Sequence, residues 1–552
     1  MSRIGTIHED ITTDVIGVIG PWQWLVTIMC TICMVIPAMN QYADAFLLQP
    51  TAECIEPRSN ASLCEFGNKT TREKCTRWQI NFLELVWIRK SWLLFCDPKV
   101  KIVSTSVISR LGSIFGCVIF GLISDSFGRK CSMWISYAAE VGFRVVMVFC
   151  DSEVWFQLLV FLRTLFSQAN IFMALILVCE IASNEWRTRL NVIAILPQTL
   201  SAVSLVSVAN LVPNETFDFL VAVCSVLVLI LLRWIPESPA WLLFEGKVSK
   251  AERILSKAAQ MNKKYLDSDF QIKPVDQEAY IVLDETRDCM KLCTKYNVRS
   301  LVIVTIAFWC LYYFIWNSLY IRVFYDKKDR NIILKVLCLV LGMMCLNISL
   351  MKKLNLRKLL VMNLVIIVFL ETFLLLVHLS IYQETTVDIM LWTALSCGVM
   401  VQAIILNITP RLLATHVRAT LLGFCHSAGH LGAILSSIVI LLNAIDSISL
   451  MIANIVLSIV LLCLCYMLPD VDGRELPDVI QDMDYYSESS KPLRWAAHKN
   501  SSSSHEEIQI RVHSYPSTNR NSSAESRPRS LPPRRIGNIL RAVSDLMWWL
   551  RN

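Results

Sequence analysis

Twelve apolar stretches, each long enough to cross a bilayer as a helix, impose the strongest constraint on how this chain can fold. A polar segment separates them into two sets of six. They lie near residues 19–42, 102–124, 131–150, 155–178, 190–212, 217–235, 300–321, 332–350, 358–379, 387–407, 419–442 and 448–468. The sequence therefore predicts an all-α membrane protein with twelve transmembrane helices in two six-helix bundles.

The composition agrees with this prediction. Hydrophobic residues make up 55% of the chain and charged residues 18%, whereas roughly a quarter of a soluble domain is charged. These values exclude a disordered chain and argue against a large soluble enzyme. The net charge of +7 does not come from a single extended basic patch. We therefore attribute it to membrane topology and expect the bilayer, not nucleic acid, as a partner.

The loops on the two sides of the predicted bilayer differ in charge. Among the short loops, one side carries ten basic residues, whereas on the other side only the loop with Arg322, Lys327, Lys328 and Arg330 carries any. The ten are Arg129, Lys130, Arg187, Arg189, Lys352, Lys353, Arg357, Lys358, Arg411 and Arg418. Because short cytoplasmic loops are enriched in Lys and Arg, this side is predicted to be cytoplasmic, and both termini with it.

These boundaries divide the chain into an N-terminal segment 1–18, a first half 19–235, an inter-half segment 236–299, a second half 300–470 and a cytoplasmic tail 471–552. The tail is rich in Ser, Arg and Pro over residues 499–535, which predicts disorder. Residues 536–550 return to a helical spacing of apolar residues among arginines. This pattern fits a helix on the anionic inner leaflet, and equally one that binds a protein partner.

The first loop, residues 43–98, is predicted to be large and extracellular. Its candidate disulfide residues are Cys54, Cys64, Cys75 and Cys96, and its candidate glycosylation residues are Asn60 and Asn68. An oxidising exterior favours two disulfides, and all three pairings of the four cysteines stay open. A third glycosylation triplet begins at Asn214, on the same side.

The loop after the second apolar stretch reads Gly121-Leu-Ile-Ser-Asp125-Ser-Phe-Gly128-Arg129-Lys130. Its two glycines allow a tight turn and close helix contact, and its acid and bases can pair across helix ends. This loop resembles the signature of the major facilitator superfamily. The resemblance implies two parallel six-helix halves around a central site.

Three further stretches narrow the resemblance. They are Pro236-Glu-Ser-Pro-Ala-Trp-Leu242, Glu180 with Arg187-Thr-Arg189, and Leu468-Pro-Asp-Val-Asp-Gly-Arg-Glu-Leu-Pro-Asp478. With the long outer loop, they resemble the organic cation, anion and carnitine transporter family. The resemblance implies a plasma-membrane carrier of small organic ions, cation or zwitterion before anion, that works by alternating access. It assigns a cytoplasmic gate to Gly121, Asp125, Gly128, Arg129, Lys130, Glu180, Arg187, Arg189 and Arg418.

The second half departs from the family pattern. Its loop over residues 351–358 has bases but no glycine, and Arg411 stands where the family has an acid. The usual glycine-rich stretch of the fourth span reads Ser167-Gln168-Ala169-Asn170. These departures keep an alternative open, a transport-deficient sensor or scaffold in the plasma membrane.

Aromatic and histidine side chains are the candidates for the substrate site. Trp309, Tyr312 and Tyr313 lie in the seventh span, where the family's paired tyrosines line the central cavity. Aromatic faces bind ammonium groups, and hydroxyls offer hydrogen bonds. His430 stands where the family often has an arginine or an aspartate, and His426 lies one turn away. Packing inside the helix bundle is the alternative role for each of them.

Ionisable side chains inside a span must be paired or hydrated. Arg110 and Glu140 lie at similar depths, about 16 and 14 Å along their spans at 1.5 Å per residue, which predicts an ion pair. Arg144, one turn from Glu140, is a second candidate partner. Arg163 and Glu371 are similarly placed, and the sequence shows no obvious partner for either.

No pattern for a nucleotide or a metal is evident in the sequence. Neither Gly-x-x-x-x-Gly-Lys-Ser/Thr nor His-Glu-x-x-His occurs, so we expect no direct ATP drive, no metal, no cofactor and no enzyme activity. Glu371 and His430 are the candidates for proton or sodium coupling.

Overall fold

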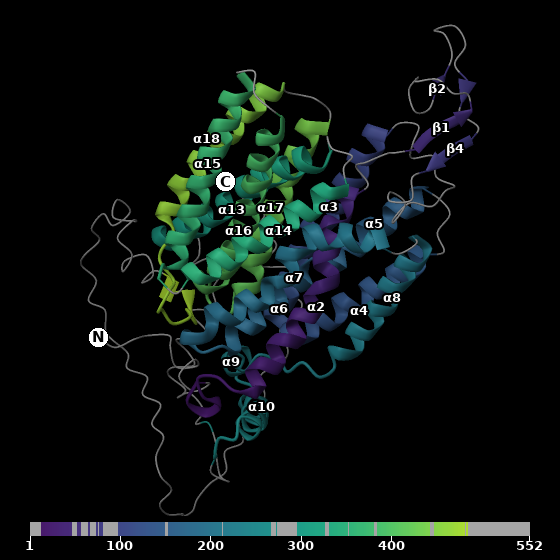
Figure 1. The fold of residues 1–552 in the computed structure, drawn as a ribbon. Helices are drawn as coiled ribbons and strands as arrows, with labels where there is room; N and C mark the ends of the chain where they lie inside the picture. The colour runs from purple at the N-terminus through teal and green to yellow at the C-terminus, as the bar shows by residue number, and fades with distance from the viewer. Residues whose placement is uncertain are drawn as a thin grey trace, which may run out of the picture.

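The computed structural model describes residues 13–46, 52–56, 65–66, 73–74, 77–80, 98–148, 153–211, 214–266, 272, 295–325, 330–351, 353–379, 384–441, 446–480 and 482–483. Helices dominate it (Figure 1), and each predicted apolar stretch coincides with one helix or, for the fourth, with two consecutive helices. The predicted all-α membrane architecture is confirmed.

The first half contains α2 (Pro21–Phe46), α3 (Pro98–Phe127), α4 (Arg129–Val148), α5 (Glu153–Ser167), α6 (Ala169–Ile181), α7 (Asn184–Leu211) and α8 (Asn214–Leu231). Two short helices follow, α9 (Pro239–Phe244) and α10 (Val248–Met261). The second half contains α13 (Tyr296–Tyr325), α14 (Arg330–Leu350), α15 (Leu356–Leu379), α16 (Glu384–Leu412), α17 (Arg418–Leu441) and α18 (Ser447–Met467).

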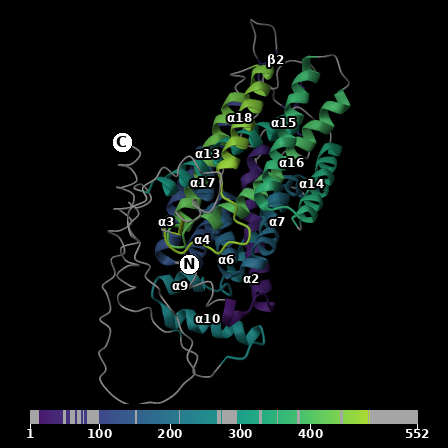
Figure 2. The same ribbon diagram turned by 90° about the vertical axis from the view of Figure 1, so that its left-hand side faces the viewer.

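The two halves lie side by side, and α9 and α10 lie at one end of the molecule (Figure 1). Figure 2 shows α10 running across this end, at a steep angle to the long helices. We call it the α10 end. At the opposite end lie short antiparallel strands within the predicted outer loop. These are β1 (Ala52–Glu56) with β4 (Arg77–Ile80), and β2 (Glu65–Phe66) with β3 (Glu73–Lys74).

The distribution of side chains is that of a membrane protein. Eight of the described helical segments are long and apolar enough to cross a bilayer, and Val221–Leu231 and Lys335–Leu350 are shorter apolar segments. Large apolar side chains such as Phe115 and Phe369 are exposed, whereas many Arg, Glu and Asn side chains are buried between helices. Lipid favours this arrangement, because apolar groups can face the hydrocarbon while polar groups must find partners inside the protein.

The fourth predicted span is interrupted at Gln168, between α5 and α6. The amide of Ile171 donates to the carbonyl of Gln168, three residues earlier, at 3.2 Å. The Gln168 side chain donates to the Pro37 carbonyl of α2, and Ser136 of α4 donates to Asn170 Oδ1 at 2.8 Å. Gln168 and Asn170 therefore tie this tight turn to the neighbouring helices α2 and α4.

Asn262, directly after α10, ties that helix to the start of α2. Its Oδ1 accepts from the Trp22 amide at 2.9 Å, and its Nδ2 donates to the Ile16 carbonyl at 3.0 Å and to Gln23 Oε1 at 2.8 Å. Gly20 leaves the space for this side chain, since a Cβ there would overlap it. Helix α10 is therefore held by the first half.

Replacing Asn262 with alanine is expected to lower the free energy of unfolding by about 1–3 kcal/mol, because backbone groups at the start of α2 lose their partners. The melting temperature of the purified protein in detergent measures this loss. Gln260→Ala, at an exposed position of α10, is the control. Equal melting temperatures of the two variants would show that the hydrogen bonds of the Asn262 side chain do not stabilise the fold.

Candidate functional site

Helix α3 of the first half and α17 of the second half pack together along a seam of small residues. A Cβ on Gly423 would overlap the carbonyl oxygen of Cys117, and a Cβ on Gly121 would lie 2.7 Å from the carbonyl oxygen of Ala419. The two backbones come this close because neither glycine has a side chain. The seam closes the two halves against each other toward the α10 end.

Glu180 of α6 joins the two halves at the α10 end. Its Oε1 accepts from Arg129 Nη2 of α4 at 3.0 Å and from Arg418 Nη1 of α17 at 2.7 Å. All three side chains are fully buried. Because a buried charge is costly without a partner, the carboxylate and the two guanidinium groups depend on one another.

Asp125, near the end of α3, caps the first turn of α17 in the other half. Its two oxygens accept from the amides of Ala419 and Thr420 at 3.3 and 2.8 Å, and Arg129 lies 3.4 Å away. A carboxylate at a helix N-terminus satisfies free amides and opposes the positive end of the helix dipole. Gly128 has φ +105°, a conformation that favours glycine, and it turns the chain from α3 into α4.

Glu237 is a member of this cluster that the sequence analysis quoted within a motif but did not assign. Its Oε1 accepts from the amides of Arg129 and Lys130 at 2.8 and 3.2 Å, at the start of α4. Burial raises the pKa of Glu237 above its usual range. The Lys130 side chain turns away and donates to the Arg233 carbonyl at 2.9 Å. The signal in the sequence was the position of this carboxylate in the quoted stretch Pro236–Leu242, just before α9.

A second contact between the halves joins α7 and α16. Arg411 Nη1 donates to Thr188 Oγ1 at 2.9 Å and lies 3.4 Å from Asp472. Asn191 donates to Asn407 Oδ1 at 3.3 Å, and Asn407 donates to the Thr188 carbonyl at 3.2 Å. Arg411 therefore links the two halves through the hydroxyl group of Thr188.

The other two arginines predicted for the gate make contacts within the first half. Arg187 donates to the carbonyls of Cys179 and Ala182 at 3.0 and 2.9 Å, at the end of α6. Arg189 is exposed, and its guanidinium lies 4.6 Å from the ring centroid of Trp186.

The segment that follows α18 lies against the same end of the molecule. The carbonyl of Pro477 accepts from Arg418 Nη2 and from the Thr415 amide, both at 3.1 Å. Asp472 accepts from the Leu356 amide at 2.6 Å and so caps α15. Glu237 accepts from amides at the start of α4 in the same way. Helices α4 and α15 correspond, because each contains the third apolar stretch of its half.

Helix α13 carries a stripe of four aromatic rings. Consecutive centroids of Trp309, Tyr313, Trp316 and Tyr320 are 5.7, 6.3 and 5.1 Å apart. Their spacing of three and four residues places them on one helix face, and each ring is almost fully buried. The ring of Tyr312 meets Tyr313 edge-on, with centroids 5.4 Å apart.

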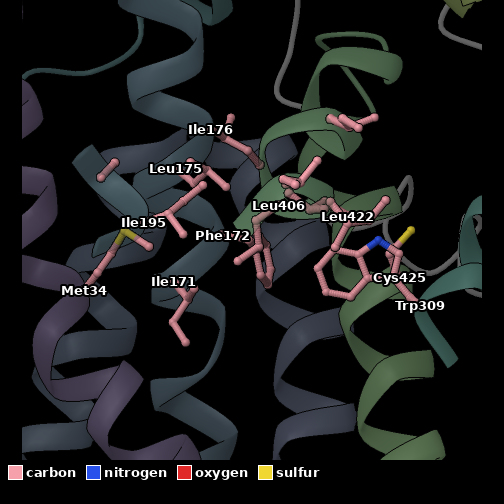
Figure 3. Close-up of a cluster of buried hydrophobic side chains, with 14 of the residues drawn as sticks. Met34, Ile171, Phe172, Leu175, Ile176, Ile195, Trp309, Leu406, Leu422 and Cys425 are labelled. Carbon is pink, nitrogen blue, oxygen red and sulfur yellow. The ribbon is translucent and has the colours of Figure 1, made fainter. Parts of the chain in front are cut away.

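His426 and His430 of α17 face this stripe. The centroid of His426 lies 4.4 Å from that of Trp309, and His430 lies 6.1 Å from Tyr313. Phe172 of α6 lies 5.2 Å from His426, so the first half reaches the cluster (Figure 3). Within the part of the chain that the structure describes, the buried atoms Nε2 of His426 and Nδ1 of His430 have no hydrogen-bond partner. The structure thus brings together the five residues predicted for the substrate site, and two imidazole nitrogens there can still accept or donate.

Hydrogen bonds to α16 fix the two tyrosines. The Tyr312 hydroxyl donates to the Gly398 carbonyl at 2.8 Å, and Gln402 Nε2 donates to the Tyr313 hydroxyl at 3.1 Å. Both rings are therefore held by neighbouring helices of the second half.

The predicted ion pair between Arg110 and Glu140 is not formed, and that prediction was wrong. Glu140 accepts from its second candidate partner Arg144 at 3.2 Å and from Asn40 of α2 at 2.6 Å. Arg110 donates to Asn317 Oδ1 of α13 at 3.0 Å. Similar depth along two helices does not set which way each side chain points. Glu140 points into the first half, and Arg110 points toward the second.

The two residues that had no obvious partner in the sequence have partners in the structure. Arg163 Nη1 donates to Asn40 Oδ1 at 2.9 Å. Arg322 Nη1 lies 3.2 Å from both oxygens of Glu371. Glu140 and Glu371 thus each stand on the third long helix of their half, with a partner on the first.

The predicted disulfide and glycosylation residues stay predictions. Cys64, Cys75, Cys96, Asn60, Asn68 and the tail helix 536–550 lie outside the described residues. Cys54 lies in β1 and Asn214 begins α8. Among the described residues, no group of three or more His, Cys, Asp or Glu could hold a metal ion.

Two six-helix halves, locked at one end by shared arginine–carboxylate contacts and enclosing polar and aromatic side chains, define a membrane transporter of small molecules. The chain matches the family model described as "Sugar (and other) transporter" over residues 27–480. It belongs to this family of the major facilitator superfamily, and it is a transporter, not an enzyme.

Individual relatives support the more specific resemblance to organic cation, anion and carnitine transporters. The human Organic cation/carnitine transporter 2 is 25% identical over 460 residues, which cover 80% of each chain. The mouse Solute carrier family 22 member 4 is 25% identical over 291 residues, 49% of each chain. The proton:xylose symporter XylE bound to 6-bromo-6-deoxy-D-glucose shares the fold, with a TM-score of 0.60 at 14% identity over 84% of this chain and 98% of XylE.

Proposed function

We propose that this protein carries small organic ions across the plasma membrane by alternating access, with the α10 end in the cytoplasm. The observation that carries the proposal is the closure at that end. Glu180 of the first half binds Arg418 of the second, and Asp125 of the first half caps α17 of the second. These contacts must break when the halves rock apart. Such a motion would uncover the buried cluster around Trp309 and His430.

The chemistry of this cluster and the names of the relatives support an organic ion as substrate. Aromatic faces attract ammonium groups, and the stripe on α13 offers four of them. The human relative is named for organic cations and carnitine. The basic residues at the α10 end support a cytoplasmic location for that end and for both termini.

The second half makes contacts at the α10 end although its sequence departs from the family pattern at residues 351–358 and at Arg411. Arg411 reaches Thr188 in the other half, and Asp472 caps α15 although the preceding loop has no glycine. These contacts favour a working carrier over the transport-deficient sensor or scaffold.

Uptake into cells that express the full chain tests the proposal. The probes are radiolabelled tetraethylammonium, carnitine and para-aminohippurate, each at acidic and neutral pH. We expect saturable uptake of at least one probe, several-fold above that of cells without the protein. Surface-exposed protein that binds a probe without moving any of them would favour the sensor instead.

A further inference from the structure

Helix α10 carries a row of three exposed bases, which we call its basic face. Lys250, Arg253 and Lys257 are spaced by three and four residues, so they share one side of the helix over about 10 Å. The opposite side is buried against α9 and the first half, and it consists of Ala251, Leu255, Ala258 and Ala259. Because α10 runs across the end of the molecule (Figure 2), its basic face points away from the long helices.

The acid of α10 itself does not neutralise the basic face. In the part of the chain that the structure describes, no acidic side chain forms an ion pair with any of the three bases. Glu252 is half-buried, and its Oε1 accepts from the Ile272 amide at 2.8 Å. Ile272 packs against the apolar cluster around Trp241 of α9. Glu252 and Ile272 therefore lie on the side of α9, and the three positive charges face solvent.

The chain comes to the same end of the molecule again after α18. The Asp478 carbonyl lies 3.4 Å from Nδ1 of His416, and the His416 ring stacks on Phe244 of α9 with centroids 5.1 Å apart. Met483 is fully buried, and residues 484–552 beyond it lie outside the described residues. Since α9 packs on α10, residue 484 starts close to the helix that carries the basic face.

The sequence that follows Met483 is complementary in charge to the basic face. Residues 484–490 read Asp-Tyr-Tyr-Ser-Glu-Ser-Ser, and the next base is Lys491. Asp484 and Glu488 are four positions apart, which is about 13 Å in an extended chain and comparable with the length of the basic face. The short connection gives these acids a high local concentration beside α10, so weak surface ion pairs are enough to hold them.

We propose that residues 484–490 of the tail dock on the basic face of α10. Asn262 ties α10 to the first half, whereas the segment before residue 484 belongs to the second half, where Asp472 caps α15. The docked tail therefore connects the two halves at the α10 end and must release when they separate. The contact itself does not depend on the transport function proposed above, and its role in the cycle rests on that function.

Carbodiimide cross-linking of the purified full-length protein tests the contact. The reagent joins a lysine amine to a carboxylate that lies within ion-pair distance, and mass spectrometry of the peptides locates the link. We expect links from Lys250 or Lys257 to Asp484 or Glu488. In a mixture of unlabelled and isotope-labelled protein, each link should join two peptides of the same isotopic form, because the tail docks on its own chain.

Arg253→Gln shows whether charge holds the tail, because Arg253 lies between the two lysines but cannot form the link itself. We expect this variant to lower the yield of the links about two- to fivefold, the effect of losing a surface ion pair. Lys358→Gln is the matched control, since it removes an exposed positive charge from α15 at the same end of the molecule, and the yield should not change. Ser487→Glu together with Ser489→Glu adds negative charge, as phosphorylation does, and should raise the yield.

The remaining outcomes overturn the proposal. Links between the two isotopic forms mean that the tail docks on a second copy of the chain. Links from Lys250 or Lys257 to acids of residues 267–288 assign the basic face to the inter-half segment instead. No link from these lysines, or equal yields in Arg253→Gln and Lys358→Gln, removes the tail from α10. The cross-linking needs no substrate, so its failure leaves the carrier proposal standing, and a failure of every uptake probe leaves the docking contact standing.

Discussion

Replacing Gly423 with leucine is expected to abolish transport while leaving the protein folded and at the cell surface. A Cβ at this position would overlap the backbone carbonyl of Cys117 in the other half. A flexible side chain could move away, but a backbone carbonyl in a helix cannot. Helices α3 and α17 would then be unable to close, so the carrier would stay open at the α10 end and could not complete its cycle.

We expect uptake to fall at least tenfold, because the leucine side chain needs more volume than small shifts of the neighbouring side chains can provide. Gly342→Leu is the control, because Gly342 is exposed on α14 and a Cβ there meets nothing within 4 Å. Uptake and surface biotinylation of both variants provide the measurement. Wild-type transport by Gly423→Leu would mean that the seam does not close during the cycle.

Replacing Glu180 with glutamine is expected to have the second large effect, this time on stability. The change leaves Arg129 and Arg418, both fully buried, without the carboxylate that they share. Breaking a buried ion pair by removing one partner costs about 3–5 kcal/mol. The melting temperature of the purified protein should drop clearly below that of the wild type.

Two variants make this measurement specific. Glu185→Gln changes an exposed acid in the first turn of α7 and should melt with the wild type. Arg129 keeps Asp125 at 3.4 Å, so among the described residues Arg418 is the arginine that loses its carboxylate partner. Adding Arg418→Met to Glu180→Gln removes that unpaired charge and should recover part of the loss. No difference between Glu180→Gln and Glu185→Gln would contradict a stabilising role for the network, and no recovery in the double variant would contradict the pairing.

The sequence predicted the location of site residues that lie close together in the chain. Asp125, Gly128 and Arg129 lie within five positions, so their place at one helix end follows from where the apolar stretches stop. Glu180 and Arg418 lie far apart in the chain, and the resemblance alone assigned them to one gate. Glu237 was missed as a gate residue, because nothing in its motif says that the chain folds back to meet the start of α4.

Hydropathy alone determined where this chain crosses the membrane, because a span needs an unbroken apolar run whatever its neighbours are. Only the tertiary structure decided the partners of the buried charges. Height along a helix can be counted from the sequence, but the direction of a side chain around the helix axis depends on which helices pack beside it. For that reason the sequence did not predict that Glu371 pairs with Arg322 or that Arg110 donates to Asn317 in the other half, and it left Arg144 as only one candidate partner of Glu140.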